Sequence, residues 1–312
     1  GIGKELIFIE EKNELNTVLK DKENIFVIGN GTNTLLNDGK LDKTFVSLKK
    51  LQKIEELGDN RVRVEAGIDF NELVDYTGKM DYTGLENLSG IPGSLGGLVY
   101  MNGGAYGAEI FDNIEEVEIL DNQFQLRILK KEEMFFTYRK TEIQEKKWIV
   151  VSVTFKFQKG FDKDRVEELR GKREGNHPLN LPNLGSTFKN PEGYFSAKLI
   201  IEAGMQGVQI GGAQISMKHP NFIVNHGDAK FENLQKYMQA IVDVIRNNGA
   251  NNILWIPGLG YQSSYTGYTK YPIVGQNIGF AIHLYPGWFG SSSGYLSFQR
   301  EWDSSIKPVA DI

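Results

Sequence analysis

The sequence contains no cysteine among its 312 residues. Disulfide bonds, thiolate metal ligands and cysteine nucleophiles are therefore excluded, and the absence fits a reducing compartment, so we expect a cytoplasmic protein. Basic residues are also in short supply, because 35 lysines and arginines stand against 40 aspartates and glutamates, for a net charge of −5. Without a basic excess to neutralise phosphates, no nucleic-acid partner is expected.

Long apolar runs and metal-ligand patterns are missing as well. No stretch approaches the roughly 20 apolar residues that span a bilayer, so we expect no membrane partner. The 4 histidines are widely spaced, without an i, i+4 pair, and no metal site is expected. The composition, 40% hydrophobic and 24% charged, is ordinary for a globular protein, and the length fits one large domain or two to three small ones.

Glycine is concentrated in one uncharged stretch, SGIPGSLGGLVYMNGGAYG, which runs from Ser89 to Gly107. Glycine lets the backbone enter positive-φ conformations and approach another molecule closely, and successive free N–H groups can wrap a phosphate. The large apolar residues between the glycines exclude a flexible linker. Two interpretations stay open on composition alone, a set of tight turns in a β domain and a buried nucleotide cradle.

A second glycine motif, GNGTNTLL at residues 29–36, directly follows the apolar run Ile25–Ile28. A short apolar run is typical of a buried strand. A strand that leads into Gly-x-Gly-Thr-Asn predicts a phosphate-binding turn, to which Thr32 and Asn33 add side-chain donors. The alternative is an ordinary turn, since Asn-Gly is also frequent there.

The remaining patterns predict a mixture of helices and strands. Alternating polar and apolar residues in RVRVEAG at 61–67, and strand-like composition at 116–120, 125–129 and 148–157, predict β-strands, the last three as a meander. Helices are expected over residues 10–19, 69–75, 162–174, 196–203 and 232–247, with Asp69 as the cap of the second. Pro178 and Pro182 indicate a domain boundary after the charged helix at residues 162–174.

Arg139 and Ser186 are the two polar residues that the local sequence singles out. Arg139 follows Phe135, Phe136 and Tyr138, so its guanidinium is placed to stabilise negative charge over a largely apolar pocket. The alternative is an exposed arginine at the end of a strand. Ser186 follows a proline-bounded loop, and a serine there exchanges a proton only when a neighbour activates it, its commoner role being to cap a turn.

Five motifs, in this order, resemble those of the UDP-N-acetylenolpyruvoylglucosamine reductase family: GNGTNTLL, SGIPGSLGGLVYMNGGAYG, FTYRKTEI, GSTFKNPEGYFSAKLIIEAG and GGAQISMKHPNFIVN. The resemblance extends over residues 4–230 and is closer to the family's short form. It implies an α+β protein with a two-subdomain FAD-binding fold of the vanillyl-alcohol-oxidase (PCMH) type and a third, substrate-binding domain. The implied domain limits are 1–160 for FAD binding, 161–232 for an incomplete substrate-binding domain and 233–312 for a tail.

The family acts in bacterial peptidoglycan synthesis, and the resemblance implies the same chemistry for this chain. NADPH would reduce bound FAD, which would reduce the enolpyruvyl group of UDP-N-acetylglucosamine enolpyruvate to give UDP-N-acetylmuramate. Arg139 matches the arginine that stabilises the enolate-like intermediate, and Ser186 matches the serine that protonates it. A monomer with a small UDP-sugar substrate is expected.

The residues that the resemblance assigns to the two ligands lie within the five motifs. Those assigned to FAD are Gly29, Asn30, Gly31, Thr32, Asn33, Gly90, Ile91, Pro92, Gly93, Ser94, Asn102, Gly104, Ala105 and Gly107. Those assigned to the substrate are Tyr138, Lys198, Gln214, Lys218 and Asn221.

The chain departs from the family at its C-terminal end. The family closes with a catalytic glutamate in a Glu-x-Glu-Val-like stretch, and no such stretch follows Asn247. Residues 234–312 instead resemble part of a cellulase-type glycoside hydrolase barrel, without that family's two catalytic glutamates, and we expect this partial α/β-barrel-like tail to be loosely packed. Three functions stay open: an active reductase, a glycoside hydrolase carried by the tail, and a protein that binds FAD and nucleotide sugar without turnover.

Overall fold

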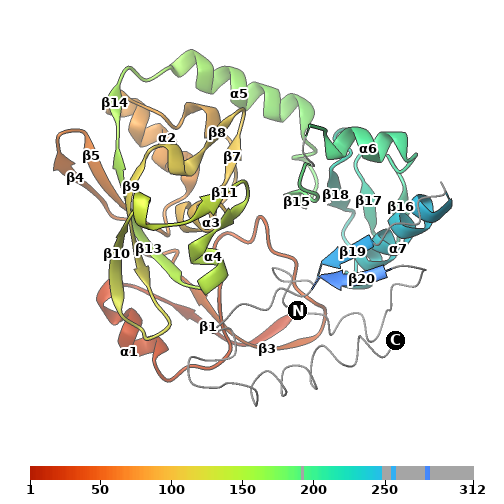
Figure 1. Cartoon of the computed structure of the whole chain (residues 1–312), viewed down its shortest axis with the longest axis horizontal. Coiled ribbons are helices and arrows are strands. Elements are labelled where there is room, and N and C mark those ends of the chain that lie inside the picture. Colours follow the sequence, from red (N-terminus) through yellow and green to blue (C-terminus); the bar gives the residue numbers. More distant parts are fainter. Residues whose placement is uncertain (191–192, 248–253, 258–277, 282–312) are drawn as a thin grey trace. The chain divides into compact units, whose positions relative to one another are not determined.

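The computed structural model of the chain describes residues 1–190, 193–247, 254–257 and 278–281 (Figure 1). Two compact units are present. The N-terminal unit contains residues 2–32 and 40–177, and the C-terminal unit contains Gly1, residues 33–39 and the described part of 178–312. None of the helices in these ranges has the length and apolar character that crossing a membrane requires.

The N-terminal unit begins with a parallel sheet of three strands. Its order is β1 (Ile2–Phe8), β3 (Lys40–Ser47) and β2 (Ile25–Val27). The expected helix at residues 10–19 is formed as a 3-10 turn, η1 (Lys12–Glu14), followed by helix α1 (Leu15–Leu19). This crossover lets β2 run parallel to β1, and it places the end of β2 directly before the first glycine motif.

A second, antiparallel sheet of five strands lies in the same unit. Its order is β10 (Leu126–Lys130), β9 (Ile114–Leu120), β13 (Ile149–Lys156), β5 (Arg61–Glu65) and β4 (Ile54–Gly58). All the strands predicted from the sequence are present, but the predicted meander is wrong, because β13 pairs with β9 and not with β10. The connection from β10 to β13 contains further elements, which carry the chain to the other side of β9.

Helices and short hairpins complete the N-terminal unit. Asp69 caps helix α2 as predicted, and its side chain accepts a hydrogen bond from Asn71 N. Residues of α2 and α3 share one core with both sheets, as Phe70, Leu95 and Val117 illustrate. The elements are α2 (Phe70–Lys79), β6 (Tyr82–Thr83), η2 (Glu86–Leu88), α3 (Leu95–Tyr100), β7 (Gly104–Ala105), β8 (Ala108–Glu109), η3 (Ile110–Asp112), η4 (Lys131–Glu133), β11 (Phe136–Thr137), β12 (Lys140–Thr141), α4 (Glu142–Lys146), β14 (Gln158–Lys159) and α5 (Lys163–Asn176).

The C-terminal unit contains an antiparallel sheet of four strands with helices α6 (Ser196–Glu202) and α7 (Phe231–Asn247). The strand order is β15 (Asn183–Ser186), β18 (Phe222–Asn225), β17 (Ala213–Ile215) and β16 (Gln209–Ile210). Tyr237 of α7 is buried, and its hydroxyl is hydrogen-bonded to the carbonyls of Val208 and Ala213. The sheet and α7 therefore share a small core.

In the tail, two described strands, β19 (Leu254–Pro257) and β20 (Ile278–Ala281), pair in parallel. Parallel pairing is the arrangement of strands in a glycoside hydrolase barrel, so it agrees with the expected barrel-like character. The other residues of the tail, and with them the expectation of loose packing, lie outside the described part of the chain.

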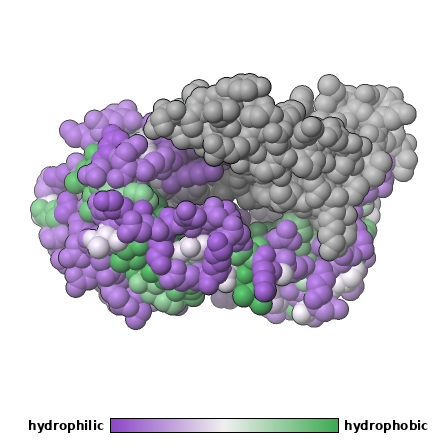
Figure 2. Space-filling view, turned by 90° about the horizontal axis from the view of Figure 1, so that it is seen from below, coloured by the Kyte–Doolittle hydropathy of each residue, from purple (hydrophilic) through white to green (hydrophobic). Residues whose placement is uncertain are grey.

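Hydrophilic residues dominate the visible face of the described chain, and hydrophobic residues occur there in small groups (Figure 2). The exposed hydrophobic side chains include Ile2, Leu6 and Phe8 of β1. These residues are separated by even numbers of positions, and successive side chains of a strand point to opposite faces of the sheet, so all three lie on the same, exposed face.

Candidate active site

The structure brings the two predicted glycine loops together. The loop at Gly29–Thr32 follows β2, and Thr32 Oγ1 donates a hydrogen bond to Pro92 O in the second loop at 3.1 Å. A Cβ on Gly29 would lie 2.6 Å from Ser94 Oγ, so a larger residue there would displace the Ser94 side chain. Neither motif is an isolated turn, which favours the interpretation as a cradle over that of unrelated turns.

Asn71 of helix α2 holds the second glycine loop. Gly90 N donates to Asn71 Oδ1 at 2.7 Å, and Asn71 Nδ2 donates to Ile91 O at 3.1 Å. The neighbouring Asp69 accepts from Asn30 Nδ2 at 3.1 Å, which connects the same helix end to the first loop. The sequence identifies Asp69 as a helix cap, but it does not predict that Asn71 forms two hydrogen bonds to the second glycine loop.

Asn102, Gly104, Ala105 and Gly107 lie in and beside the β7–β8 hairpin. Asn102 is fully buried and has a positive φ of 43°, a strained conformation for a residue with a side chain. Gly107 has a φ of 81°, and a Cβ there would meet nothing within 4 Å. Its backbone is therefore open on the side where a side chain would stand.

These residues fit the flavin nucleotide that the sequence implies. Gly31, with a φ of 72°, also has open space where a Cβ would stand. Within the described residues, the side-chain oxygens Ser89 Oγ and Asn102 Oδ1 are buried without a hydrogen-bond partner. A buried acceptor without a partner costs about 1–3 kcal/mol, so a ligand rich in hydroxyl and N–H groups would relieve that cost.

Arg139 joins this assembly from the turn between β11 and β12, where its φ of 56° is left-handed. Its Nη1 donates to Asn102 O at 2.9 Å, and its Nη2 donates to Gly104 O. The guanidinium lies 4.9 Å from the ring centre of Tyr138, which is 47% exposed. Arg139 is thus bonded to the backbone of the glycine-rich segment and is not a free arginine at a strand end.

Glu109 is a site residue that the sequence alone did not reveal. Asn102 Nδ2 donates both to Glu109 Oε2 at 2.7 Å and to Thr137 O at 3.0 Å. These two bonds fix the orientation of the Asn102 amide. Through Thr137, the amide also holds strand β11, which leads into Arg139. No local sequence pattern points to the bond between Asn102 and Glu109, and Thr137 is 35 residues away from Asn102.

Replacing Glu109 with alanine is expected to slow substrate reduction by about 10- to 100-fold, because Arg139 loses its fixed position. Single-turnover kinetics of the substrate-reducing step measure the effect. The matched control is Asp112→Ala, which removes the reciprocal cap at η3, where Glu109 N donates to Asp112 Oδ2 at 2.8 Å, but leaves the contact with Asn102. Equal losses in the two variants would show that Glu109 acts only on the local turn.

In the C-terminal unit, Ser186 and Asn221 are brought together. Ser186 ends β15, is exposed, and pairs with Phe222 of β18. Asn221 is buried, and its side chain accepts from Phe188 N at 2.9 Å and donates to Phe188 O at 2.8 Å. Asn221 therefore fixes the segment that carries Ser186, which is a supporting role in addition to the predicted contact with substrate.

The other predicted substrate residues differ in their surroundings. Gln214 is held at both ends of its amide, by Gly207 O at 3.1 Å and by His226 Nε2 at 2.9 Å. Lys198 of α6 is exposed, and Lys218 is exposed in the turn before β18. Asn33, predicted to bind FAD, is exposed and belongs by its contacts to the C-terminal unit.

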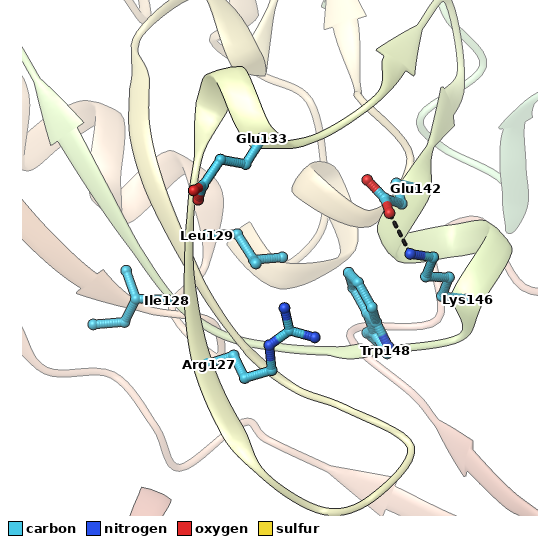
Figure 3. Close-up of a pocket in the computed structure, with 7 residues that line it drawn as sticks. All are labelled: Arg127, Ile128, Leu129, Glu133, Glu142, Lys146 and Trp148. Carbon is cyan, nitrogen blue, oxygen red and sulfur yellow. Dashed lines mark ion pairs between the residues drawn. The ribbon is translucent and has the colours of Figure 1, made fainter.

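A cavity of about 300 Å³ in the N-terminal unit contains none of the predicted site residues (Figure 3). Lys146 forms an ion pair with Glu142 at 2.5 Å and lies 4.7 Å from the ring centre of Trp148, with Arg127 at 5.6 Å from the same ring. The charge of Lys146 is thus matched by the Glu142 carboxylate, and we do not assign the cavity to the site. Its lining residues are Arg127, Ile128, Leu129, Glu133, Glu142, Lys146 and Trp148.

Family models match three parts of the chain. The FAD binding domain model matches residues 7–126, and the C-terminal domain model of UDP-N-acetylenolpyruvoylglucosamine reductase matches residues 177–251. A cellulase model (glycosyl hydrolase family 5) matches residues 221–310, which agrees with the resemblance of the tail. Apart from residues 33–39, the first match lies in the N-terminal unit, and apart from His177 the second lies in the C-terminal unit.

Curated relatives and a solved structure give the same result. A UDP-N-acetylenolpyruvoylglucosamine reductase of Fusobacterium nucleatum is 56% identical over 236 residues, which cover 75% of this chain and 84% of the relative. One from Caldanaerobacter subterraneus is 41% identical over 229 residues, which cover 72% and 76%. A crystal structure of UDP-N-acetylenolpyruvylglucosamine reductase from Thermus caldophilus aligns with a TM-score of 0.67 at 30% identity, covering 77% of this chain and 87% of that one.

Proposed function

Because the chain belongs to the UDP-N-acetylenolpyruvoylglucosamine reductase family, we propose that it reduces UDP-N-acetylglucosamine enolpyruvate to UDP-N-acetylmuramate with NADPH. The observation that supports this proposal most strongly is the hydrogen-bonded assembly that connects Asn102 and Gly104 to Arg139. It connects two predicted cofactor residues to a predicted catalytic residue within one compact unit.

Bound FAD supplies the capacity to accept a hydride equivalent from NADPH and to pass it to the enolpyruvyl double bond. Gly29–Thr32 and Gly90–Ser94 would hold the nucleotide, with backbone N–H groups of the first loop toward its phosphates. Arg139 would stabilise the negative charge that develops on the substrate carboxylate, because its guanidinium stays charged and is fixed by two carbonyl groups. Ser186 would donate a proton to the adjacent carbon of the substrate.

The substrate-binding assignment rests on the C-terminal unit. Lys198 and Lys218 carry exposed ammonium groups that suit the diphosphate of a UDP-sugar, while Gln214 presents an amide of fixed orientation. Tyr138 and Asn221 complete the proposed set. We further propose that the enzyme is monomeric and that it is cytoplasmic, and the absence of cysteine from the whole sequence agrees with the second of these.

An anaerobic experiment tests the proposal. The purified full chain should show flavin absorbance, lose it when NADPH is added, and regain it when the enolpyruvyl UDP-sugar is added. Loss without recovery would mean that the chain binds FAD and NADPH but does not turn over, which is the outcome expected of a protein impaired by the missing C-terminal glutamate. A colourless protein would contradict the reductase assignment.

The cellulase match over residues 221–310 favours a second candidate, a glycoside hydrolase. Such an enzyme needs two carboxylates at a fixed separation, and the tail offers no match to that family's pair. Release of reducing sugar from a soluble cello-oligosaccharide by the full chain tests it. We expect none, and steady release would support the second candidate.

A further inference from the structure

The two glycine loops, residues 29–32 and 90–94, together form what we call the glycine cradle, and it contains no positively charged side chain. None of the residues predicted to bind FAD is basic, and Asp69, which bonds to Asn30, adds a negative charge beside them. A dinucleotide brings a pyrophosphate with two negative charges. Backbone N–H groups supply only partial charges, so a cation from elsewhere in the unit would complete the site.

Arg173 supplies a cation at this place. It lies in the last turn of helix α5, and its Nε donates to Ser89 O at 3.0 Å, 84 residues away in sequence. Its Cδ lies 2.7 Å from the point where a Cβ on Gly90 would stand, so the side chain lies directly over the loop. The guanidinium is also 5.4 Å from the ring centre of Tyr106. Three contacts therefore fix its position against the cradle.

The hydrogen bond of Arg173 to Ser89 O uses Nε and leaves the two terminal nitrogens available to a ligand. Across the described ranges, neither Nη1 nor Nη2 has a hydrogen-bond partner, and no carboxylate forms an ion pair with the side chain. Burial lowers the pKa of Arg173, because the charged guanidinium is partly removed from water. Ser89 Oγ, on the same loop, is also buried without a partner. A half-buried cation without an anion is costly, and an anionic ligand would offset the cost.

We propose that Arg173 binds the pyrophosphate of the flavin nucleotide through its terminal nitrogens, which rests on the proposed FAD site. The bond from Nε to Ser89 O orients the planar fork, so that the two remaining nitrogens can bind phosphate oxygens together. Arg173 thereby supplies the charge that the glycine loops lack. The predicted set of FAD-binding residues does not include it.

The test compares Arg173→Gln with Arg170→Gln in the full chain after removal of flavin. Arg170 lies on the same helix near the same loop, but its Nη2 is paired with Asp75 Oδ1 at 2.8 Å. Titration with FAD should show about 10- to 100-fold weaker binding for Arg173→Gln and little change for Arg170→Gln. Riboflavin, which has no phosphate, should bind both variants as it binds the parent protein. The FAD affinity of Arg173→Gln should also depend less on salt.

Two results would overturn the proposal. The first is unchanged FAD affinity in Arg173→Gln, and a raised KM for the UDP-sugar beside it would place the arginine on the substrate. The second is an equal loss of riboflavin affinity, since it would show damage to the loop. If Arg173→Gln does not fold, Arg173→Lys keeps the charge without the fork and should bind FAD with intermediate affinity. Failure of the parent protein to bind FAD would instead count against the proposed function.

Discussion

Replacing Arg139 with alanine is expected to slow substrate reduction by about 100- to 1,000-fold, as when a fixed group that stabilises developing negative charge is removed. The NADPH-dependent loss of flavin absorbance should continue at a similar rate, because that half-reaction precedes the developing charge on the substrate. Single-turnover measurements of each half-reaction separate the two effects.

Arg139→Lys should recover little of this loss. The guanidinium bonds to two carbonyls at once, those of Asn102 and Gly104, and a single ammonium group cannot reproduce that arrangement. Arg127→Ala is the matched control, because Arg127 also lies over an aromatic ring but in the separate cavity beside Trp148. Parental rates in Arg139→Ala would show that Arg139 only holds the β7–β8 hairpin.

Replacing Ser186 with alanine is expected to keep flavin binding and flavin reduction but to lower substrate reduction by about 100- to 10,000-fold, the usual contribution of a positioned proton donor. Ser186 is exposed at the end of β15, so the substitution leaves no cavity and should not change the melting temperature. The rate at which substrate reoxidises the reduced flavin measures the effect.

Thr187→Val is the matched control for this variant. Thr187 is the next residue and is also exposed, and its backbone N donates to Asn221 O at 2.8 Å, a bond that the substitution keeps. Ser186→Cys should recover part of the activity, because a thiol can also donate a proton. Unchanged turnover in Ser186→Ala would remove the proton-donor assignment.

Local features of the fold could be predicted from the sequence. Helix α2 begins after Asp69 as its capping pattern predicts, and the apolar run Ile25–Ile28 contains β2. Helix α5 differs at its end, since it continues through Gly175 to Asn176. A glycine weakens a helix without always ending it, and His177 N still bonds to Arg173 O at 2.8 Å.

Contacts between distant segments could not be predicted in this way. The pairing of β13 with β9 depends on the path of the intervening chain. Alternation of polar and apolar residues predicts that a segment is a strand but does not predict its partner strand. Asn71, Glu109 and Arg173 act through bonds to segments up to 84 residues away, and each has an unremarkable local sequence. The glycine motifs could be predicted because their composition is unusual. The residues that hold them in place could not be predicted, because nothing in their local sequence distinguishes them.

The segment shared by two family models includes helix α7. The reductase C-terminal model and the cellulase model overlap at residues 221–251. In the structure, Tyr237 of α7 belongs to the same core as Met205, Ala213 and Ile215 of the reductase unit. Helix α7 thus packs against the sheet of the C-terminal unit, all of which lies within the reductase match.

Product formation by the purified full chain tests the central claim most directly. With NADPH and the enolpyruvyl UDP-sugar, we expect one UDP-N-acetylmuramate for each NADPH consumed, and no consumption above the background rate without the UDP-sugar. Consumption of NADPH that is independent of the UDP-sugar, with no UDP-N-acetylmuramate formed, would contradict the claim that this chain is a working reductase.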